Sequence, residues 1–398
     1  MKKCIIIASV SLPILIICFL FFEPIIIYTS GWNTFPKTSK LQPIKHHNDE
    51  NLKKADSILN EMFIRLKAPG LSVAVGMNGN VIWSNAIGYE DIENAKELRL
   101  DTKFRIGSTS KAVTSLGIGV LLQNGKLNIN SKVKEFVPYA NEKISEITLK
   151  QLASHTSGIR NYGTCFCFPI WEHLNNDEYT SVQESVEIFS DSSLLFPSGT
   201  DFSYSSYNFT LLSAMIEGAS GKNFLSFMNT SVFTPLGLDH IKGETASLSS
   251  KDISKFYEVD ENMYKEVFKV NNSNKWAGGG FIATPTDLVT LGNAFLNYEL
   301  LDKETTKILI QPVPLDNGQI NKQQYAIGWR NSFTETMFGN NHKVQILHHA
   351  GTAAGSTSVF ILFPEYNLSI SILMNRSGTT SVLFAYAYEL AKTFILKN

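Results

Sequence analysis

The chain has 398 residues, of which 43% are hydrophobic and 18% charged, and its formal net charge is −1. This length suits one large or two medium domains with a real core, and the near-neutral charge argues against nucleic acid as the main partner. The sequence contains no glycine-rich phosphate loop and no H-E-x-x-H or C-x-x-C metal pattern, so we expect no cofactor and no metal.

The chain begins with an apolar segment. Lys2 and Lys3 precede the uncharged stretch from Cys4 to Phe22, which as a helix would span about 29 Å, close to a bilayer core. Lysines on this flank favour a cytoplasmic N-terminus and an exported remainder. We therefore predict that residues 1–30 are a membrane anchor. A cleaved signal sequence is the alternative, although no A-x-A-like cleavage site follows.

Residues 31–49 are polar and predict a tether, and residues 50–398 form the main domain. Helical spacing of apolar residues, with caps and stops, predicts helices over 55–66, 108–124, a short segment from 148, 209–220, 285–296 and 380–396. Runs rich in β-branched and aromatic residues predict strands over 71–77, 81–87, 325–330, 344–349, 356–363 and 368–374. Strands at both ends of a helical middle predict an α+β fold, in which terminal helices flank an antiparallel sheet and a helical subdomain is inserted.

The segment from Ser108 to Lys111 reads S-T-S-K and opens an apolar run that ends at Gly125. This spacing puts Ser108 at the start of a buried helix and Lys111 one turn later on the same face. A serine hydroxyl is a poor nucleophile until a base takes its proton, and a desolvated lysine amine can be that base. S-x-x-K also occurs by chance, as at residues 131–134, so the motif alone leaves a structural role for Ser108 open.

Three further segments follow in order: His155-Thr156-Ser157-Gly158, Tyr204-Ser205-Ser206 and His349-Ala350-Gly351. Together with the S-x-x-K they resemble the serine β-lactamase and penicillin-binding-protein superfamily, in particular its class-C-like branch. The resemblance covers about residues 50 to 395 and includes the phrases QLASHTSGIRNY, WAGGGFIATPTDLVTLGNAF and HHAGTAAGSTSVFILFPE. It implies a β-lactamase/transpeptidase-like fold and a serine hydrolase that acts through an acyl-enzyme.

The resemblance also assigns catalytic roles. Ser108 would be the acylated nucleophile, and Lys111 would take its proton or stabilise the partner base. Tyr204 would protonate the leaving group and later activate water. Backbone N–H groups of Ser108 and Thr352 would form the oxyanion hole.

Three residues would contact the substrate, namely Ser206, His349 and Gly351, the last by letting substrate backbone approach an edge strand. Two of them depart from the family pattern. Ser206 replaces the asparagine of Y-x-N, and His349 replaces the K-T-G lysine, so that its positive charge would depend on pH. We expect His155 and His348 to be structural, since adjacent residues of a strand point to opposite faces.

These departures favour ester, amide or peptide substrates over β-lactams. The sequence therefore predicts a hydrolase held by its N-terminal helix, with the catalytic domain on the periplasmic side of a membrane and a small molecule or peptide as substrate. Two alternatives stay open: a β-lactamase that hydrolyses penicillins or cephalosporins, and a non-catalytic binding or scaffolding protein that keeps the fold.

Four cysteines are present. Cys4 and Cys18 lie in the first apolar segment. One residue separates Cys165 from Cys167, a spacing unsuited to an ordinary disulfide, and both lack the partners of a zinc site. We expect them to be structural or loop residues.

Overall fold

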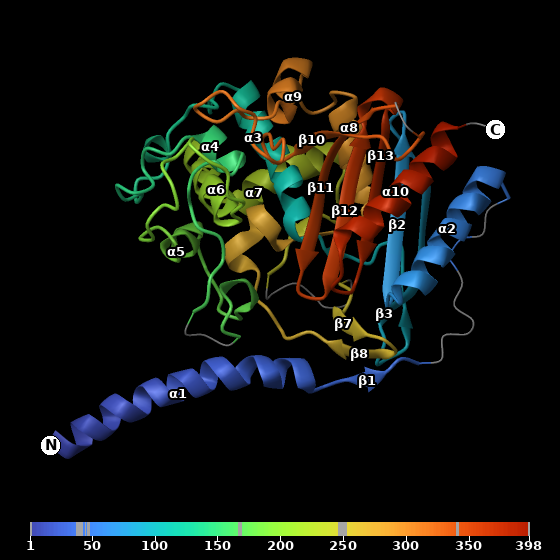
Figure 1. The fold of residues 1–398 in the computed structure, drawn as a ribbon. Coiled ribbons are helices and arrows are strands. Elements are labelled where there is room, and N and C mark those ends of the chain that lie inside the picture. Colours follow the sequence, from blue (N-terminus) through green and yellow to red (C-terminus); the bar gives the residue numbers. More distant parts are fainter. Residues whose placement is uncertain are drawn as a thin grey trace.

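A seven-stranded antiparallel sheet, in the order β10-β11-β12-β13-β2-β3-β4, forms the centre of the fold (Figure 1). The structure, a computed structural model, describes residues 2–36, 43, 45, 48–165, 169–245, 253–339 and 342–396. The strands of this sheet are β2 (Gly70–Met77), β3 (Asn80–Asp91), β4 (Lys96–Glu97), β10 (Arg330–Thr334), β11 (Val344–Ala353), β12 (Ser356–Phe363) and β13 (Leu368–Met374). The sheet joins both ends of the main domain, because β13 pairs with β2.

Two terminal helices, α2 (Glu50–Leu66) and α10 (Thr380–Ile395), cover one face of this sheet (Figure 1). The carboxylate of Asp49 caps α2 by accepting from the backbone N–H of Leu52 at 3.1 Å. In the apolar stripe of α2, Ala55, Leu59 and Met62 are fully buried against the sheet and α10, and Ile58, Phe63 and Leu66 pack against them partly buried. The predicted terminal helices are therefore confirmed, and their burial rests on the helical spacing of their apolar residues.

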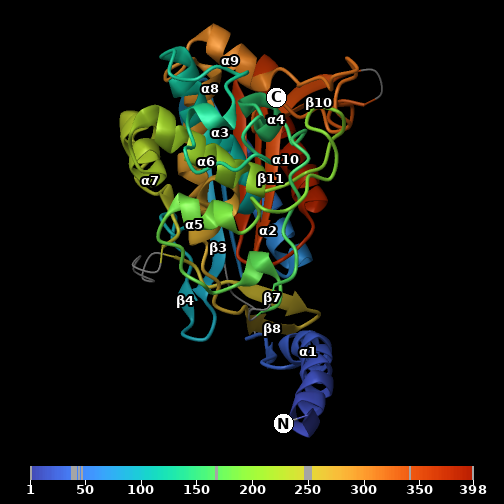
Figure 2. The same ribbon diagram turned by 90° about the vertical axis from the view of Figure 1, so that its left-hand side faces the viewer.

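Helices of the inserted region pack on the opposite face (Figure 2). They are α3 (Ser110–Gln123), α4 (Leu149–Ala153), α5 (Val182–Glu187), α6 (Tyr207–Ser220), α7 (Phe224–Met228), α8 (Pro285–Leu296) and α9 (Lys303–Ile310). The predicted caps are present: Thr148 and Gln151 form a capping box on α4, and Thr284 caps α8. A small three-stranded sheet consists of β5 (Phe104–Arg105), β9 (Phe281–Ala283) and β6 (Lys242–Gly243), and its strand β5 leads into the turn before α3.

One predicted strand, over residues 325–330, is wrong. The backbone turns there instead, with the N–H of Ala326 donating to the carbonyl of Trp329 at 2.8 Å and Gly328 at φ +78°. The Trp329 indole is buried and donates to Oγ of Ser115 on α3 at 2.8 Å. Apolar residues in this segment therefore pack against a helix rather than a strand, and β10 begins only at Arg330.

The N-terminal helix α1 (Lys2–Thr29) extends away from the main domain (Figures 1 and 2). Its Ser11–Thr29 part is long and apolar enough to cross a membrane, a property that an N-terminal signal sequence shares. After it, β1 (Asn33–Thr34) pairs with β8 (Met263–Glu266), which pairs with β7 (Tyr257–Asp260). This part of the predicted tether is therefore fixed to the main domain.

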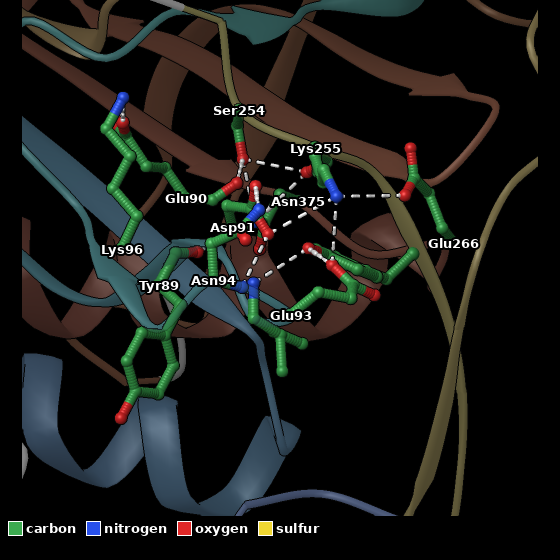
Figure 3. A network of polar contacts seen from close by, with 12 residues as sticks. Tyr89, Glu90, Asp91, Glu93, Asn94, Lys96, Ser254, Lys255, Glu266 and Asn375 are labelled. Carbon is green, nitrogen blue, oxygen red and sulfur yellow. Dashed lines mark hydrogen bonds and ion pairs between the residues drawn. The ribbon is translucent and has the colours of Figure 1, made fainter. Parts of the chain in front are cut away.

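A polar network fastens the β7–β8 hairpin to the end of β3 (Figure 3). Nζ of Lys255 lies 3.3 Å from a carboxylate oxygen of Asp91, 3.2 Å from Glu93 and 3.3 Å from Glu266. Burial opposes the charge of Lys255, but the carboxylates outweigh burial and raise its pKa. Nδ2 of Asn375, just after β13, donates to the Lys255 carbonyl at 3.2 Å, so three parts of the chain meet here.

Cys165 is disulfide-bonded, which agrees with the structural role expected for it. Cys167 lies outside the described residues. Cys18 is free and exposed on α1.

Candidate active site

Ser108 lies on a 3₁₀ turn, Gly107–Thr109, between β5 and the start of α3. Gly107 adopts φ +49°, and a Cβ there would lie 2.5 Å from the carbonyl oxygen of Thr352. Only glycine allows this approach, so the turn packs directly on the end of β11. Ser108 is partly exposed, at the place predicted for it beside a buried helix.

Lys111 is fully buried on the first turn of α3. Its Nζ lies 3.2 Å from Ser108 Oγ, 3.0 Å from Ser206 Oγ and 2.5 Å from the carbonyl oxygen of Gly278. Burial, and then the charge of Arg330, lowers the pKa of Lys111 well below its usual value. A buried amine with a lowered pKa loses its charge more readily than a free lysine, which suits it to accept a proton from Ser108.

Tyr204 precedes α6 and lies over the same amine, with Nζ of Lys111 4.9 Å from its ring centroid. Burial raises the pKa of Tyr204 to about 12, against a hydrogen bond with Ser108 and the charge of Arg330. The side chain is therefore a phenol in the resting site. A phenol that contacts Ser108 is placed to give a proton to a leaving group.

His155 holds Tyr204 in position, as its expected structural role implies. Its ring centroid lies 4.2 Å from that of Tyr204, and its Nδ1 accepts from the backbone N–H of Ser205 at 3.3 Å. Burial, and then the charge of Lys111, lowers the pKa of His155. The neutral imidazole acts as a packing surface for Tyr204 rather than as a proton carrier.

His349 corrects the expectation that its charge depends on pH. The side chain is buried on β11, where Nδ1 donates to the carbonyl of Ala350 at 2.7 Å and Nε2 accepts from the hydroxyl of Tyr325 at 2.8 Å. Burial lowers the pKa of His349 well below its usual value, and the charges of Arg330 and Lys111 add to this. Burial therefore favours the neutral form of the ring. His348 points to the other face, toward Phe384 of α10.

Arg330, at the start of β10, is a site residue that the sequence analysis missed. Nε and Nη2 donate to Oε1 of Gln323 at 3.1 and 2.7 Å, and the guanidinium carbon lies 5.5 Å from the Tyr204 ring centroid. Its Nη1 lies 3.5 Å from Nε2 of His349. The arginine follows Y-A-I-G-W, which had been assigned to a strand, so nothing in the sequence placed its side chain beside Ser108.

Gly351 lines the cavity beside Ser108 and also packs closely against the chain itself. A Cβ at this position would lie 1.9 Å from the carbonyl oxygen of Ile106 and 2.9 Å from the backbone nitrogen of Ser108. Packing therefore requires a glycine here, and contact with substrate backbone stays a prediction. Ser206 likewise uses its hydroxyl to hold Lys111, although it still lines the cleft.

The end of β11 forms an open edge beside Ser108. β10 pairs with β11 only as far as His348, and a two-residue turn joins Ala353 to its partner Ser356 on β12. N–H groups of an antiparallel strand alternate in direction. Because Ala353 closes the hairpin with β12, Thr352 turns its N–H away from β12, toward the turn that carries Ser108.

Two cavities meet at Ser108, Tyr204 and Thr352. The first, of about 360 Å³, also contacts Arg330 and His349. The second, of about 410 Å³, also contacts Ser206 and Lys275 and reaches other parts of the chain. Ser108 therefore lies at the centre of a cleft with room on both sides for the two halves of a substrate.

Comparisons with known proteins agree with this architecture. The family model described as Beta-lactamase matches residues 55–393. The human mitochondrial serine beta-lactamase-like protein LACTB is 28% identical, over 77% of this chain and 71% of its own length. Protein flp of Staphylococcus aureus is 26% identical, over 83% of this chain and 64% of its own. The structure of a D-amino acid amidase from Ochrobactrum anthropi, complexed with D-phenylalanine, matches with a TM-score of 0.73 at 18% identity, over 87% of this chain and 99% of that one.

Proposed function

Because this chain belongs to the beta-lactamase family, whose relatives are serine hydrolases, we propose that it hydrolyses esters, amides or peptides through an acyl-enzyme at Ser108. The observation that carries the proposal is the 3.2 Å contact between Nζ of Lys111 and Ser108 Oγ. The amine is buried and its pKa is lowered, so it can act as a base toward the hydroxyl.

In acylation, the uncharged amine of Lys111 takes the Ser108 proton while Oγ attacks the substrate carbonyl carbon. Backbone N–H groups of Ser108 and Thr352 hold the oxygen of the tetrahedral adduct. Its collapse breaks the bond to the leaving group, which takes the proton of Tyr204, and Lys111 then reprotonates the phenolate. In deacylation, water gives a proton to Tyr204 as Tyr204 passes its own to Lys111, and Lys111 returns a proton to Oγ as the acyl group leaves.

Arg330 changes the expected choice of substrate. His349 is neutral, but the guanidinium in the same cavity is charged at every working pH and pairs with no carboxylate among the described residues. An anionic group on the substrate would find a fixed cation there. The expectation that replacing the K-T-G lysine with His349 disfavours β-lactams is therefore weakened. β-Lactams, which carry a carboxylate, become the second candidate substrates.

The membrane anchor and the extracytoplasmic site are part of the same proposal. They are supported by the exposed apolar surface of α1 and by lysines confined to its N-terminal flank. Fractionation should find the full-length chain in membranes. A mature protein that starts near Ser30 and is free in the soluble fraction would instead support a cleaved signal sequence.

Mass spectrometry of the intact protein tests the hydrolase. A fluorophosphonate should add to Ser108, and a penicillin tests separately whether a β-lactam also acylates it. Ser108→Ala should remove both adducts and lower ester turnover at least about 10³-fold while the fold stays intact. A wild-type protein that is folded but never labelled would support the non-catalytic alternative.

A further inference from the structure

We propose that the end of α1 forms one wall of the substrate cleft, and that the cleft takes an amphiphilic substrate from the bilayer that holds α1. The inference rests on the proposed function, because it concerns which ester or amide reaches Ser108. Its basis is that Tyr28 of α1 and Ser108 line the same cavity of about 410 Å³.

Two polar contacts fix the end of α1 to the main domain. The carboxylate of Glu23 is 4% exposed, and its two oxygens accept from the backbone N–H of Ile170 at 2.9 and 3.1 Å. Nζ of Lys265, on β8, donates to the carbonyl of Ile27 at 2.5 Å. Glu23, a charged residue in the apolar part of α1, thus binds the main domain and holds the last turns of α1 in one place.

The docked end presents aromatic side chains to the cleft and to solvent. Nζ of Lys265 lies 5.5 Å from the ring centroid of Tyr28 and 4.7 Å from that of Trp32. The Trp32 indole donates to the carbonyl of Tyr28 at 2.8 Å. Tyr28 is 63% exposed, so its ring has a free face beside the cavity.

The position of Glu23 sets the distance between cleft and bilayer. Residues 4–22, which precede it, would span about 29 Å as a helix, which matches a bilayer core. The main domain then begins where the bilayer ends, with no spacer between them. Tyr28 and Trp32 fall at the interface, where such aromatic residues concentrate.

An amphiphile suits this arrangement. Along α1, apolar side chains face outward up to the cleft, including Phe21 at 66% and Phe22 at 54% exposure. A substrate tail could remain in the bilayer beside them while its polar carbonyl group passes Tyr28 to reach Ser108. A water-soluble substrate would gain nothing from this wall.

The test uses the full chain in phosphatidylcholine vesicles and two fluorophosphonates, one with an ethyl and one with a dodecyl chain. In both, Oγ of Ser108 attacks phosphorus, fluoride leaves and the hydroxyl proton passes to Lys111. The ratio of dodecyl to ethyl labelling rates, followed by intact mass, should be at least about tenfold higher when enzyme and dodecyl reagent share vesicles than when they are in separate vesicles.

Variants locate the effect. Tyr28→Ala should lower the ratio at least about threefold, whereas Ile26→Ala, an exposed substitution on the same helix, should leave it unchanged. Glu23→Ala should also lower the ratio, and Glu23→Gln should keep it, because glutamine retains an oxygen that can accept from Ile170.

Equal ratios in shared and separate vesicles, or in the wild type and Tyr28→Ala, would overturn the amphiphile while normal labelling leaves the nucleophile in place. Failure of both reagents to label Ser108 would overturn the proposed function itself, and with it this inference.

Discussion

The two cavities that meet at Ser108 hold their cations in different ways. On one side, Arg330 is hydrogen-bonded to Gln323 and keeps its charge at every working pH. On the other, Lys275 is buried and donates to the carbonyl of His173; burial, then the charge of Arg105, lowers its pKa to about 7. One wall of the cleft thus carries a fixed charge, and the other carries a charge that is half lost at neutral pH.

The largest effect should come from removing the base, because Lys111 would serve substrates bound in either cavity. Lys111→Met keeps a side chain of similar length but removes the base, so kcat/KM for any ester should fall at least about 10³-fold. Thermal unfolding should change little, because methionine fills the space of the buried lysine side chain. A variant that is acylated at the wild-type rate would show that Lys111 is not the base.

Removing the fixed charge should have the next largest effect. Arg330→Ala should lower kcat/KM for an ester with a carboxylate on its acyl part about 10- to 100-fold more than for the matching neutral methyl ester. Arg330→Lys, which keeps the charge but not the planar fork, should fall in between. An equal loss on both esters would assign Arg330 to positioning Tyr204 instead of binding an anion.

The titrating charge predicts a pH dependence. Lys275 is protonated below its pKa of about 7 and neutral above it, so an attraction for an anionic group in its cavity should be present at pH 5.5 and fade by pH 8.5. Two anionic esters test this: one carries a carboxylate on its acyl part, the other on its leaving group. For one of the two, the preference over a neutral ester should be lost as the pH rises to 8.5.

The matched control is Lys275→Met. It should remove the pH dependence of the preference for the anionic ester, and it should leave the preference that depends on Arg330 unchanged. The measurement is kcat/KM for each ester relative to a neutral ester between pH 5.5 and 8.5. A preference that fades equally in Lys275→Met would assign the titration to another group.

The smallest expected effect concerns His349, which should not titrate near neutral pH. Because burial lowers the pKa of His349 well below its usual value, its ring should show no midpoint between pH 5.5 and 8.5 in a proton–nitrogen NMR titration. A midpoint near pH 6.5 for His349 would show that this ring carries a pH-dependent charge in the cavity that also contacts Arg330.

The sequence predicted most of the fold because its signals are local. Asn78-Gly79 allows the positive φ angles of the β2–β3 turn, and Gly221 ends α6 in a left-handed conformation. Apolar spacing was enough to place Ser108 and Lys111 one turn apart. None of these features depends on distant parts of the chain.

What the sequence could not predict depends on tertiary contacts. The role of Arg330 follows from a turn that packs Trp329 against α3, and the neutrality of His349 follows from burial beside Tyr325. Gly351 is needed because Ile106 and Ser108 approach it from far away in the chain. Motifs placed these residues near one site, but their charges and partners required the packed structure.

The close packing of Gly107 on Thr352 also ties activity to synthesis. Ser108 leaves the ribosome early, whereas β11, which carries the proposed second oxyanion donor Thr352, is among the last segments to emerge. A nascent or half-translocated chain therefore carries its nucleophile without a complete site to activate it. Activity should therefore appear only after the final hairpin, β11–β12, has joined the sheet.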